Sequence, residues 1–182
     1  MSERMEPRSM LVDREEIKGL VDRLIVVLER HAKLHRGLLV ILERKKSAMV
    51  AVRPEDLEAV LVEERAALDT IADSERDRVG LTEEVGAAFG FPEPRRMRLL
   101  DLVQRVGEDH RDSLLDLRDE LRELADAIDR LNRLNGTLVL HSLEHIHLFL
   151  SLLSGKDPAA KIYSKAGGEE AVAGSIIVDR RI

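Results

Sequence analysis

The chain has 182 residues and carries 29 Lys and Arg against 35 Asp and Glu, so its formal net charge is −6. It contains no cysteine, which excludes a disulfide framework, a thiol nucleophile and a cysteine-based zinc or iron–sulfur site. The acidic balance and the 2% aromatic content argue against nucleic-acid binding, which relies on a basic surface and on stacking side chains.

The N-terminal segment and the apolar runs give no membrane or export signal. The first ten residues, MSERMEPRSM, are interrupted by charges and lack the apolar core of a secretory signal. The longest uninterrupted apolar runs, Leu24–Leu28 and Leu38–Leu42, are far shorter than the ~20 residues that span a bilayer. We therefore expect a cytoplasmic protein with no stable membrane insertion.

The first half of the chain predicts a helical hairpin. Apolar residues at steps of three and four predict a helix over about 11–52. Pro54 disfavours helix at Arg53 and suits the first turn of a second helix, which we expect over about 54–79, ending near Gly80. The short connection makes the two helices antiparallel neighbours. Short helices are expected within 81–106, the first of them starting at Thr82.

The clearest predicted element is a third long helix over about 108–154. Its apolar stripe keeps the three–four alternation, which is typical of coiled-coil-like packing. The stripe consists of Leu114, Leu117, Leu121, Leu124, Ile128, Leu131, Asn135, Leu138, Ser142, His145, Phe149 and Leu152. The fold class is thus all-α: an antiparallel hairpin plus a long third helix form a bundle over 1–155, and 156–182 form a flexible tail that binds a partner.

The histidines and carboxylates give no convincing catalytic or metal site. His31 and His35 are four residues apart, as are His141 and His145, but catalytic zinc needs a third protein ligand. Helical di-iron sites need two Glu-x-x-His pairs, and we find one, Glu144 with His147. Nucleotide-binding loops and nucleophile elbows are absent from the sequence. We expect no cofactor, no metal and no enzymatic activity, with His31 and His145 as polar seam positions.

The segment LNRLNGTLVL places polar residues inside the long stripe. A buried Asn in a seven-residue repeat fixes register and partner number, and Gly136 permits close approach of another helix. Asn135 is therefore either a register device inside the bundle or a contact for an incoming helix. Both interpretations stay open at this point.

Several segments, in order along the chain, resemble the FlgN-type flagellar export chaperones. LLVILERKKSAMVA and PEDLEAVLVEERAAL resemble the opening hairpin of that family. LNRLNGTLVLHSL resembles its Asn-x-x-Asn-Gly element, and KIYSKAGGEE followed by SIIVDRR resembles its tyrosine-and-glycine tail. In this chain Tyr163 is followed by Ser-Lys-Ala-Gly, where many relatives place Gly closer to the Tyr.

The resemblance implies a cytoplasmic type III export chaperone. It would bind the terminal helical segments of flagellar hook–filament junction proteins (FlgK/FlgL type), prevent their premature association and deliver them to the export gate. The candidate client-binding residues are Asn135, Leu138, Leu148, Phe149, Leu152, Leu153, Ile162, Ile176, Ile177 and Val178. Tyr163 is the candidate for contact with the export gate.

One alternative shares all of the helix patterns. A generic coiled-coil adaptor or scaffold would have the same stripes but no flagellar clients, and fold class does not distinguish the two. The exposed heptad pattern also permits either a monomer or a homodimer.

Overall fold

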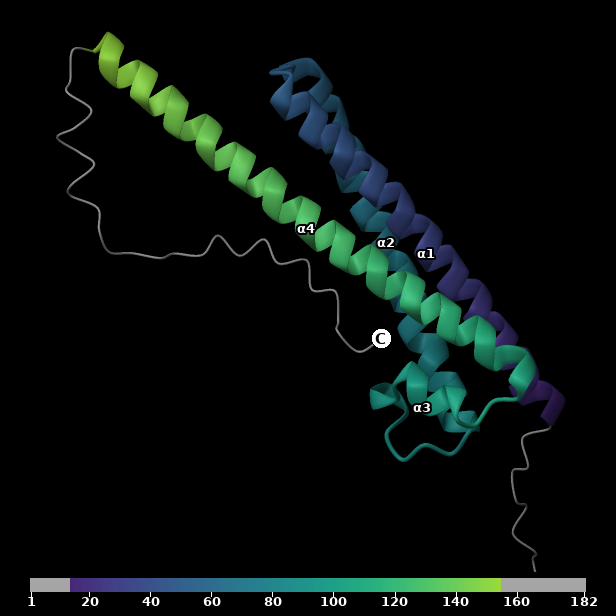
Figure 1. Cartoon of the computed structure of the whole chain (residues 1–182). Coiled ribbons are helices and arrows are strands. Elements are labelled where there is room, and N and C mark those ends of the chain that lie inside the picture. Colours follow the sequence, from purple (N-terminus) through teal and green to yellow (C-terminus); the bar gives the residue numbers. More distant parts are fainter. Residues whose placement is uncertain (1–13, 155–182) are drawn as a thin grey trace, which may run out of the picture. The chain divides into compact units, whose positions relative to one another are not determined.

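A computed structural model describes residues 14–154, and in that range it contains helices and no strands. The elements are α1 (Arg14–Val50), α2 (Pro54–Ala88), the short 3₁₀ helix η1 (Pro94–Arg96), α3 (Leu99–Val103) and α4 (Glu108–Leu153) (Figure 1). The predicted all-α class with one very long C-terminal helix is therefore confirmed.

The described residues divide into two compact units, and each is described by itself. The first unit holds residues 14–34 and 69–122, and the second holds 35–68 and 123–154. Each unit thus contains a part of α1, a part of α2 and a part of α4, because these three helices run through both. The sequence predicts one bundle over 1–155 and gives no sign of this division.

In the first unit α1 and α2 pack as antiparallel neighbours. Arg23 lies 3.7 Å from Glu84, and Arg30 lies 3.7 Å from Asp77, so later residues of α1 meet earlier residues of α2. These pairs are exposed and stabilise the fold little, but they report the register of the two helices. The tip of the hairpin lies in the second unit, where Val52 adopts a positive φ of 52° between the two helices.

Helix α2 is longer than its sequence predicts. The expected end near Gly80 and the separate short helix from Thr82 are wrong, because α2 continues through both residues to Ala88. A glycine inside a helix costs about 1 kcal/mol relative to alanine. Leu81 and Val85 are buried immediately after it, and burying each side chain contributes about 1.5–3 kcal/mol, which outweighs that cost.

The end of α2 is fixed by a glycine in the left-handed region. Gly90 has φ +70°, and the N–H of Phe91 donates to the carbonyl oxygen of Gly86 at 2.9 Å, which closes the last turn. A Cβ on Gly86 would lie 3.0 Å from the Cα of Pro94, so only glycine permits this close approach of η1. The Arg105 guanidinium then stacks over the Phe91 ring at 4.0 Å.

Each unit has its own apolar core. In the first unit the core residues come from α1, α2, α3, the segments beside η1 and the start of α4: Val21, Leu24, Leu28, Ala32, Leu81, Val85, Met97, Leu102, Val103, Leu114, Leu117 and Leu121. In the second unit they are Leu38, Leu42, Ala48, Val60, Leu124, Ile128 and Leu131. The buried residues of α4 follow the three–four alternation that the sequence predicts for this helix.

Candidate functional site

The buried seam of α4 ends at Asn135 in the second unit. This side chain is 2% exposed, and its Nδ2 donates a hydrogen bond to the carbonyl oxygen of Leu42 at 3.2 Å. Its Oδ1 is buried as well and has no hydrogen-bond donor among the described residues. Asn135 therefore packs against α1, which agrees with its interpretation as a register device, and it is not on the exposed surface that we expected for client binding.

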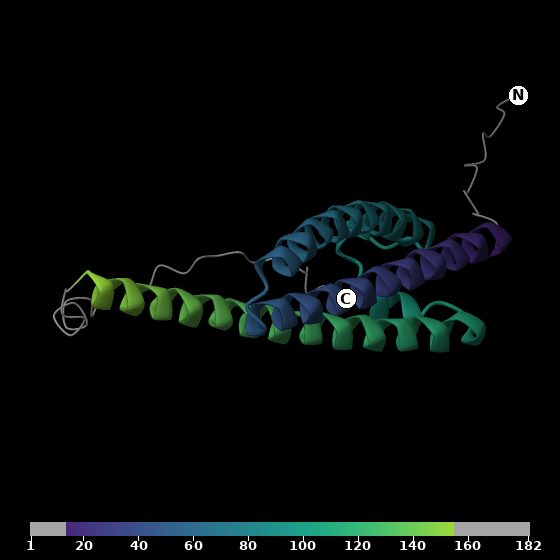
Figure 2. The same ribbon diagram turned by 90° about the horizontal axis from the view of Figure 1, so that it is seen from above.

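Beyond Asn135, α4 runs past the end of α1. From the Asn135–Leu42 contact, α1 continues for eight residues to Val50, whereas α4 continues for eighteen residues to Leu153. The ten extra residues correspond to about 15 Å of helix. Figure 2 shows this last part of α4 extending beyond the end of α1, and within the second unit no other described helix covers it.

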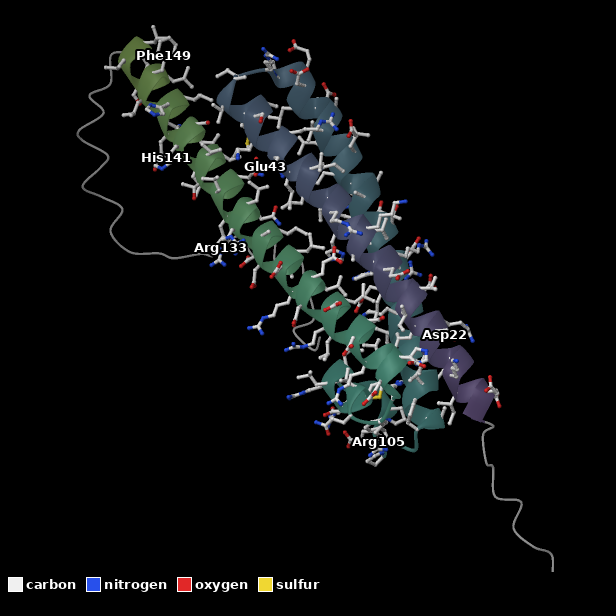
Figure 3. All side chains as sticks on the ribbon, turned by 45° about the vertical axis from the view of Figure 1, so that its right-hand side comes forward. Asp22, Glu43, Arg105, Arg133, His141 and Phe149 are labelled. Atoms are coloured by element: carbon white, nitrogen blue, oxygen red, sulfur yellow. The ribbon has the colours of Figure 1, made fainter. Side chains whose placement is uncertain are left out.

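The overhanging part of α4 is apolar and exposed. Figure 3 labels Phe149 near its end, and this ring is 61% exposed. The large exposed hydrophobic residues of α4 from Leu134 onward are Leu134, Val139, Leu140, Leu143, Ile146, Leu148, Phe149, Leu150, Leu152 and Leu153. Glu144 is the only Asp, Glu, Lys or Arg between Leu134 and Leu153. Ordinary monomer surfaces do not carry such a patch, and larger apolar patches mark interaction sites.

By length and composition alone, one helix among the described residues is apolar enough to cross a membrane, and it is α4. None of the apolar stretch that meets this criterion is buried. Our expectation of no membrane insertion rested on uninterrupted apolar runs, and in this stretch the interruptions are serines, histidines and one glutamate. An exposed apolar surface of this kind is typical of an interaction site.

Four predicted client-binding residues lie on this surface. Leu148, Phe149, Leu152 and Leu153 are all exposed, and Leu138 is half-buried next to the bundle. The other predicted residues of this set, Ile162, Ile176, Ile177 and Val178, lie outside the described residues, as does Tyr163.

The exposed apolar residues after Asn135 do not follow the strict seven-residue repeat that predicts the buried part of α4. A strict seven-residue repeat continues the seam through Ser142 and His145, which are polar. Because an α-helix has 3.6 residues per turn, a strict repeat drifts around it by about 20° every seven residues.

Steps of four compensate for this drift. After Asn135 the next two apolar positions, Val139 and Leu143, each lie four residues further along the helix. Ile146, Leu150 and Leu153 then resume the alternation of three and four residues. These five residues, here named the exposed stripe, lie between 0° and about 80° around the helix from Asn135, when each residue turns by about 100°. All five are exposed, and the consecutive steps of four were the signal that could have revealed them.

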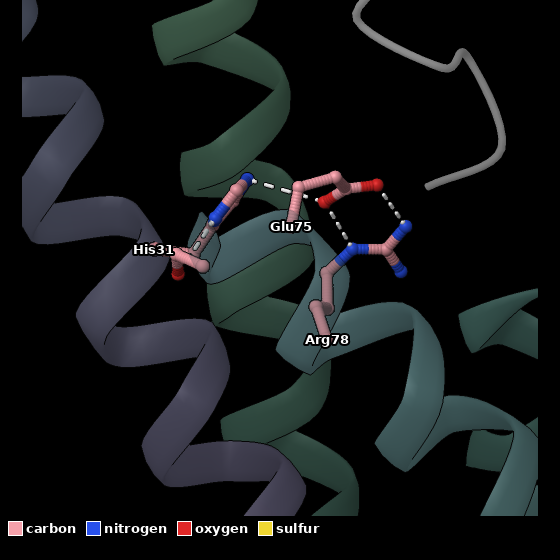
Figure 4. A network of polar contacts seen from close by, with 4 residues as sticks. His31, Glu75 and Arg78 are labelled. Atoms are coloured by element: carbon pink, nitrogen blue, oxygen red, sulfur yellow. Dashed lines mark hydrogen bonds and ion pairs between the residues drawn. The ribbon is translucent and has the colours of Figure 1, made fainter. Parts of the chain in front are cut away.

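The buried histidine of α1 has a structural place in the first unit. The Nδ1 of His31 is hydrogen-bonded to the Oγ of Ser74 at 3.2 Å, and its Nε2 lies 3.6 Å from a carboxylate oxygen of Glu75 (Figure 4). The same carboxylate accepts two hydrogen bonds of 2.7 Å from Arg78. The network ties α1 to α2, and it agrees with the interpretation of His31 as a polar seam position.

The remaining histidines do not form a metal centre in the described range. His141 is exposed and lies 3.3 Å from Glu144 one turn further along α4. Among residues 14–154 no group of three or more His, Asp or Glu side chains is placed to hold a metal ion.

Two ion pairs join α1 to α2 near the hairpin tip in the second unit. The Arg44 guanidinium donates to both carboxylate oxygens of Glu63, which lowers the pKa of Glu63 through this hydrogen bond. Lys45 donates to Glu64 at 2.8 and 3.0 Å. Like the pairs in the first unit, they report the register of α1 and α2, here at the hairpin tip.

Comparison with known proteins decides the family. A model of the family described as FlgN protein matches residues 10–171, which is most of the chain. The chain belongs to the FlgN family. The resemblance noted from the hairpin and the Asn-x-x-Asn-Gly element is thereby confirmed, and with it the broad role of a chaperone in flagellum biogenesis.

One curated relative gives a name without a function. This FlgN protein is 24% identical over 134 residues to "Uncharacterized protein YvyG" from Bacillus subtilis (strain 168), and the match covers 74% of this chain and 81% of the relative. No solved structure matches it significantly.

Proposed function

We propose that this FlgN protein is a cytoplasmic export chaperone that holds a terminal helical segment of flagellar hook–filament junction proteins against the overhanging end of α4. The observation that supports this proposal is the exposed apolar end of α4, which the chain's own hairpin is too short to cover. Binding would keep the client from premature association until it is delivered to the export gate.

Helix-in-groove packing explains how such a chaperone works without a nucleotide. An amphipathic client helix would place its apolar face on Leu148, Phe149 and their neighbours, as amphipathic helices do on other hydrophobic surfaces. Fully burying one large side chain is worth about 1.5–3 kcal/mol. The client's ordering cost offsets part of this gain, so the affinity stays moderate and release needs no separate energy source.

The C-terminal residues complete the proposal. Ile162, Ile176, Ile177 and Val178 would add apolar contacts to the bound client, and Tyr163 would contact the export gate. These roles rest on the family resemblance of the segments KIYSKAGGEE and SIIVDRR. Tyr163→Ala separates the two activities, because it should weaken gate binding and leave client binding intact.

Titration calorimetry with C-terminal fragments of the two junction proteins tests the client proposal. We expect saturable one-to-one binding to the wild-type chain. Phe149→Asp should weaken it by at least about tenfold, since it places a charge where roughly 1.5–3 kcal/mol of burial is lost. Val62→Asp is the matched control, because Val62 is similarly exposed, at 67%, but lies on α2. A chain ending at Gly155 should bind more weakly than the full chain.

The possible outcomes separate the candidate functions. Unchanged affinity of Phe149→Asp would show that the client does not use the end of α4. Absence of binding to either fragment by a well-folded chain would favour the generic coiled-coil adaptor.

A further inference from the structure

One histidine lies at the centre of the apolar surface proposed to bind the client. When each residue turns by about 100°, Leu138 and Leu152 lie about 20° around the helix from His145, seven residues before it and seven after it. Phe149 lies about 40° away on the next turn, and Leu148 about 60° away on the other side. Four of the proposed client-binding side chains therefore surround a single imidazole.

The His145 side chain is exposed in the second unit. The sequence predicts it as a polar seam position, but the buried seam ends at Asn135. All residues of α4 from 141 to 150 are exposed, so no described element packs on this imidazole, and at the hairpin end Arg53 pairs with Asp56 at 3.6 Å. A partner that covers the apolar surface would therefore cover the imidazole as well.

The other ionisable groups near the end of α4 lie on different sides of the helix. Glu144 is about 100° around the helix from His145, and its carboxylate lies 3.3 Å from the ring of His141. His147 is about 160° from His145. Within the described part of this surface, His145 is thus the ionisable group that the proposed client-binding residues enclose.

The charge of this imidazole bears directly on binding. Histidine changes its charge between about pH 5 and 8. Moving a charged group out of water into an apolar contact costs much more than moving a neutral one. A bound client therefore favours the neutral imidazole, so the affinity is complete above this pH range and is lost as the pH falls through it.

We propose that His145 makes client binding pH-dependent: the neutral imidazole accepts the apolar face of the client helix, and protonation of the imidazole releases it. The inference rests on the proposed function, because it names the group that regulates the same surface. It assigns His145 a binding role in place of the seam position that the sequence predicts.

Titration calorimetry at pH 7.5 and pH 5.5, with C-terminal fragments of the two junction proteins, tests the inference. The dissociation constant of the wild-type chain should be about tenfold higher at pH 5.5, since one titrating group changes it by at most tenfold per pH unit. His145→Gln should remove the difference between the two pH values, because glutamine stays neutral. His147→Gln is the matched control and should keep the wild-type difference. Circular dichroism verifies the helical fold at both pH values.

Nuclear magnetic resonance of the histidine side chains gives a direct readout. The titration midpoint of His145 should move to lower pH when a saturating fragment is added, and that of His147 should move less.

Three results would overturn the inference. They are equal wild-type affinity at both pH values, a pH dependence that persists in His145→Gln, and a His145 midpoint that the client leaves in place. Each would leave the proposed function standing, because the client still binds. Absence of binding at both pH values by a well-folded chain would overturn the proposed function and this inference together.

Discussion

Asn135 shows at the residue scale how a polar side chain marks a boundary. It is buried against α1, and its Nδ2 donates one hydrogen bond to the carbonyl oxygen of Leu42. Its side-chain oxygen Oδ1 has no hydrogen-bond donor among the described residues. Such an acceptor costs about 1–3 kcal/mol. The residue therefore lowers the stability of the bundle, and what it gives in return is a fixed register at the point where the buried seam ends.

This cost leads to a stability prediction for Asn135. Asn135→Leu should raise the free energy of unfolding by about 1 kcal/mol, because it removes the unpaired acceptor and adds apolar burial. Asn135→Ala, which leaves a cavity instead, should lower it. Urea unfolding of the three chains measures both differences, and a clear loss of stability in Asn135→Leu would contradict this account of the residue.

Two glycines of the α2 region are predicted to respond in opposite directions. Gly80 lies inside α2 with open space around its Cα, so Gly80→Ala should stabilise the chain by about 0.5–1 kcal/mol. Gly90 has a positive φ, so Gly90→Ala should destabilise it by about 1 kcal/mol. Thermal unfolding of the Gly80→Ala and Gly90→Ala variants, compared with the wild-type chain, measures both differences in stability. A loss of stability in Gly80→Ala would argue against a continuous α2.

At the scale of elements, spacing predicts which helices form but not where each one stops packing. The hairpin break at Pro54 and the long α4 follow from local chemistry and appear as expected. The end of α2 was missed because burial of Leu81 and Val85 overrides the helix-breaking tendency of Gly80. Local propensity carries no information about such tertiary contacts.

The sequence predicts the apolar residues of the candidate site but not their register or the burial of Asn135. The exposed apolar residues at the end of α4, such as Phe149, follow from the long stripe in the sequence. The register of that surface does not follow from a strict repeat, because the difference between 3.5 and 3.6 residues per turn accumulates along the helix. The burial of Asn135 depends on where α1 ends, which only the structure gives.

At the scale of the whole molecule, the central feature is a length difference between helices in the second unit. A hairpin as long as α4 would bury the exposed stripe in the chain's own core. A shorter hairpin leaves a helical surface open, and the FlgN family context makes a flagellar client its proposed occupant.

Hydrogen–deuterium exchange across the chain, with and without a saturating junction-protein fragment, tests the central claim most directly. The claim is that the client covers the overhanging end of α4. Amides of residues 136–153 should exchange rapidly in dilute free protein and become protected on binding, whereas those of 54–68 on α2 should be unchanged. Protection confined to α2, or tight binding with no protection of 136–153, would contradict the account.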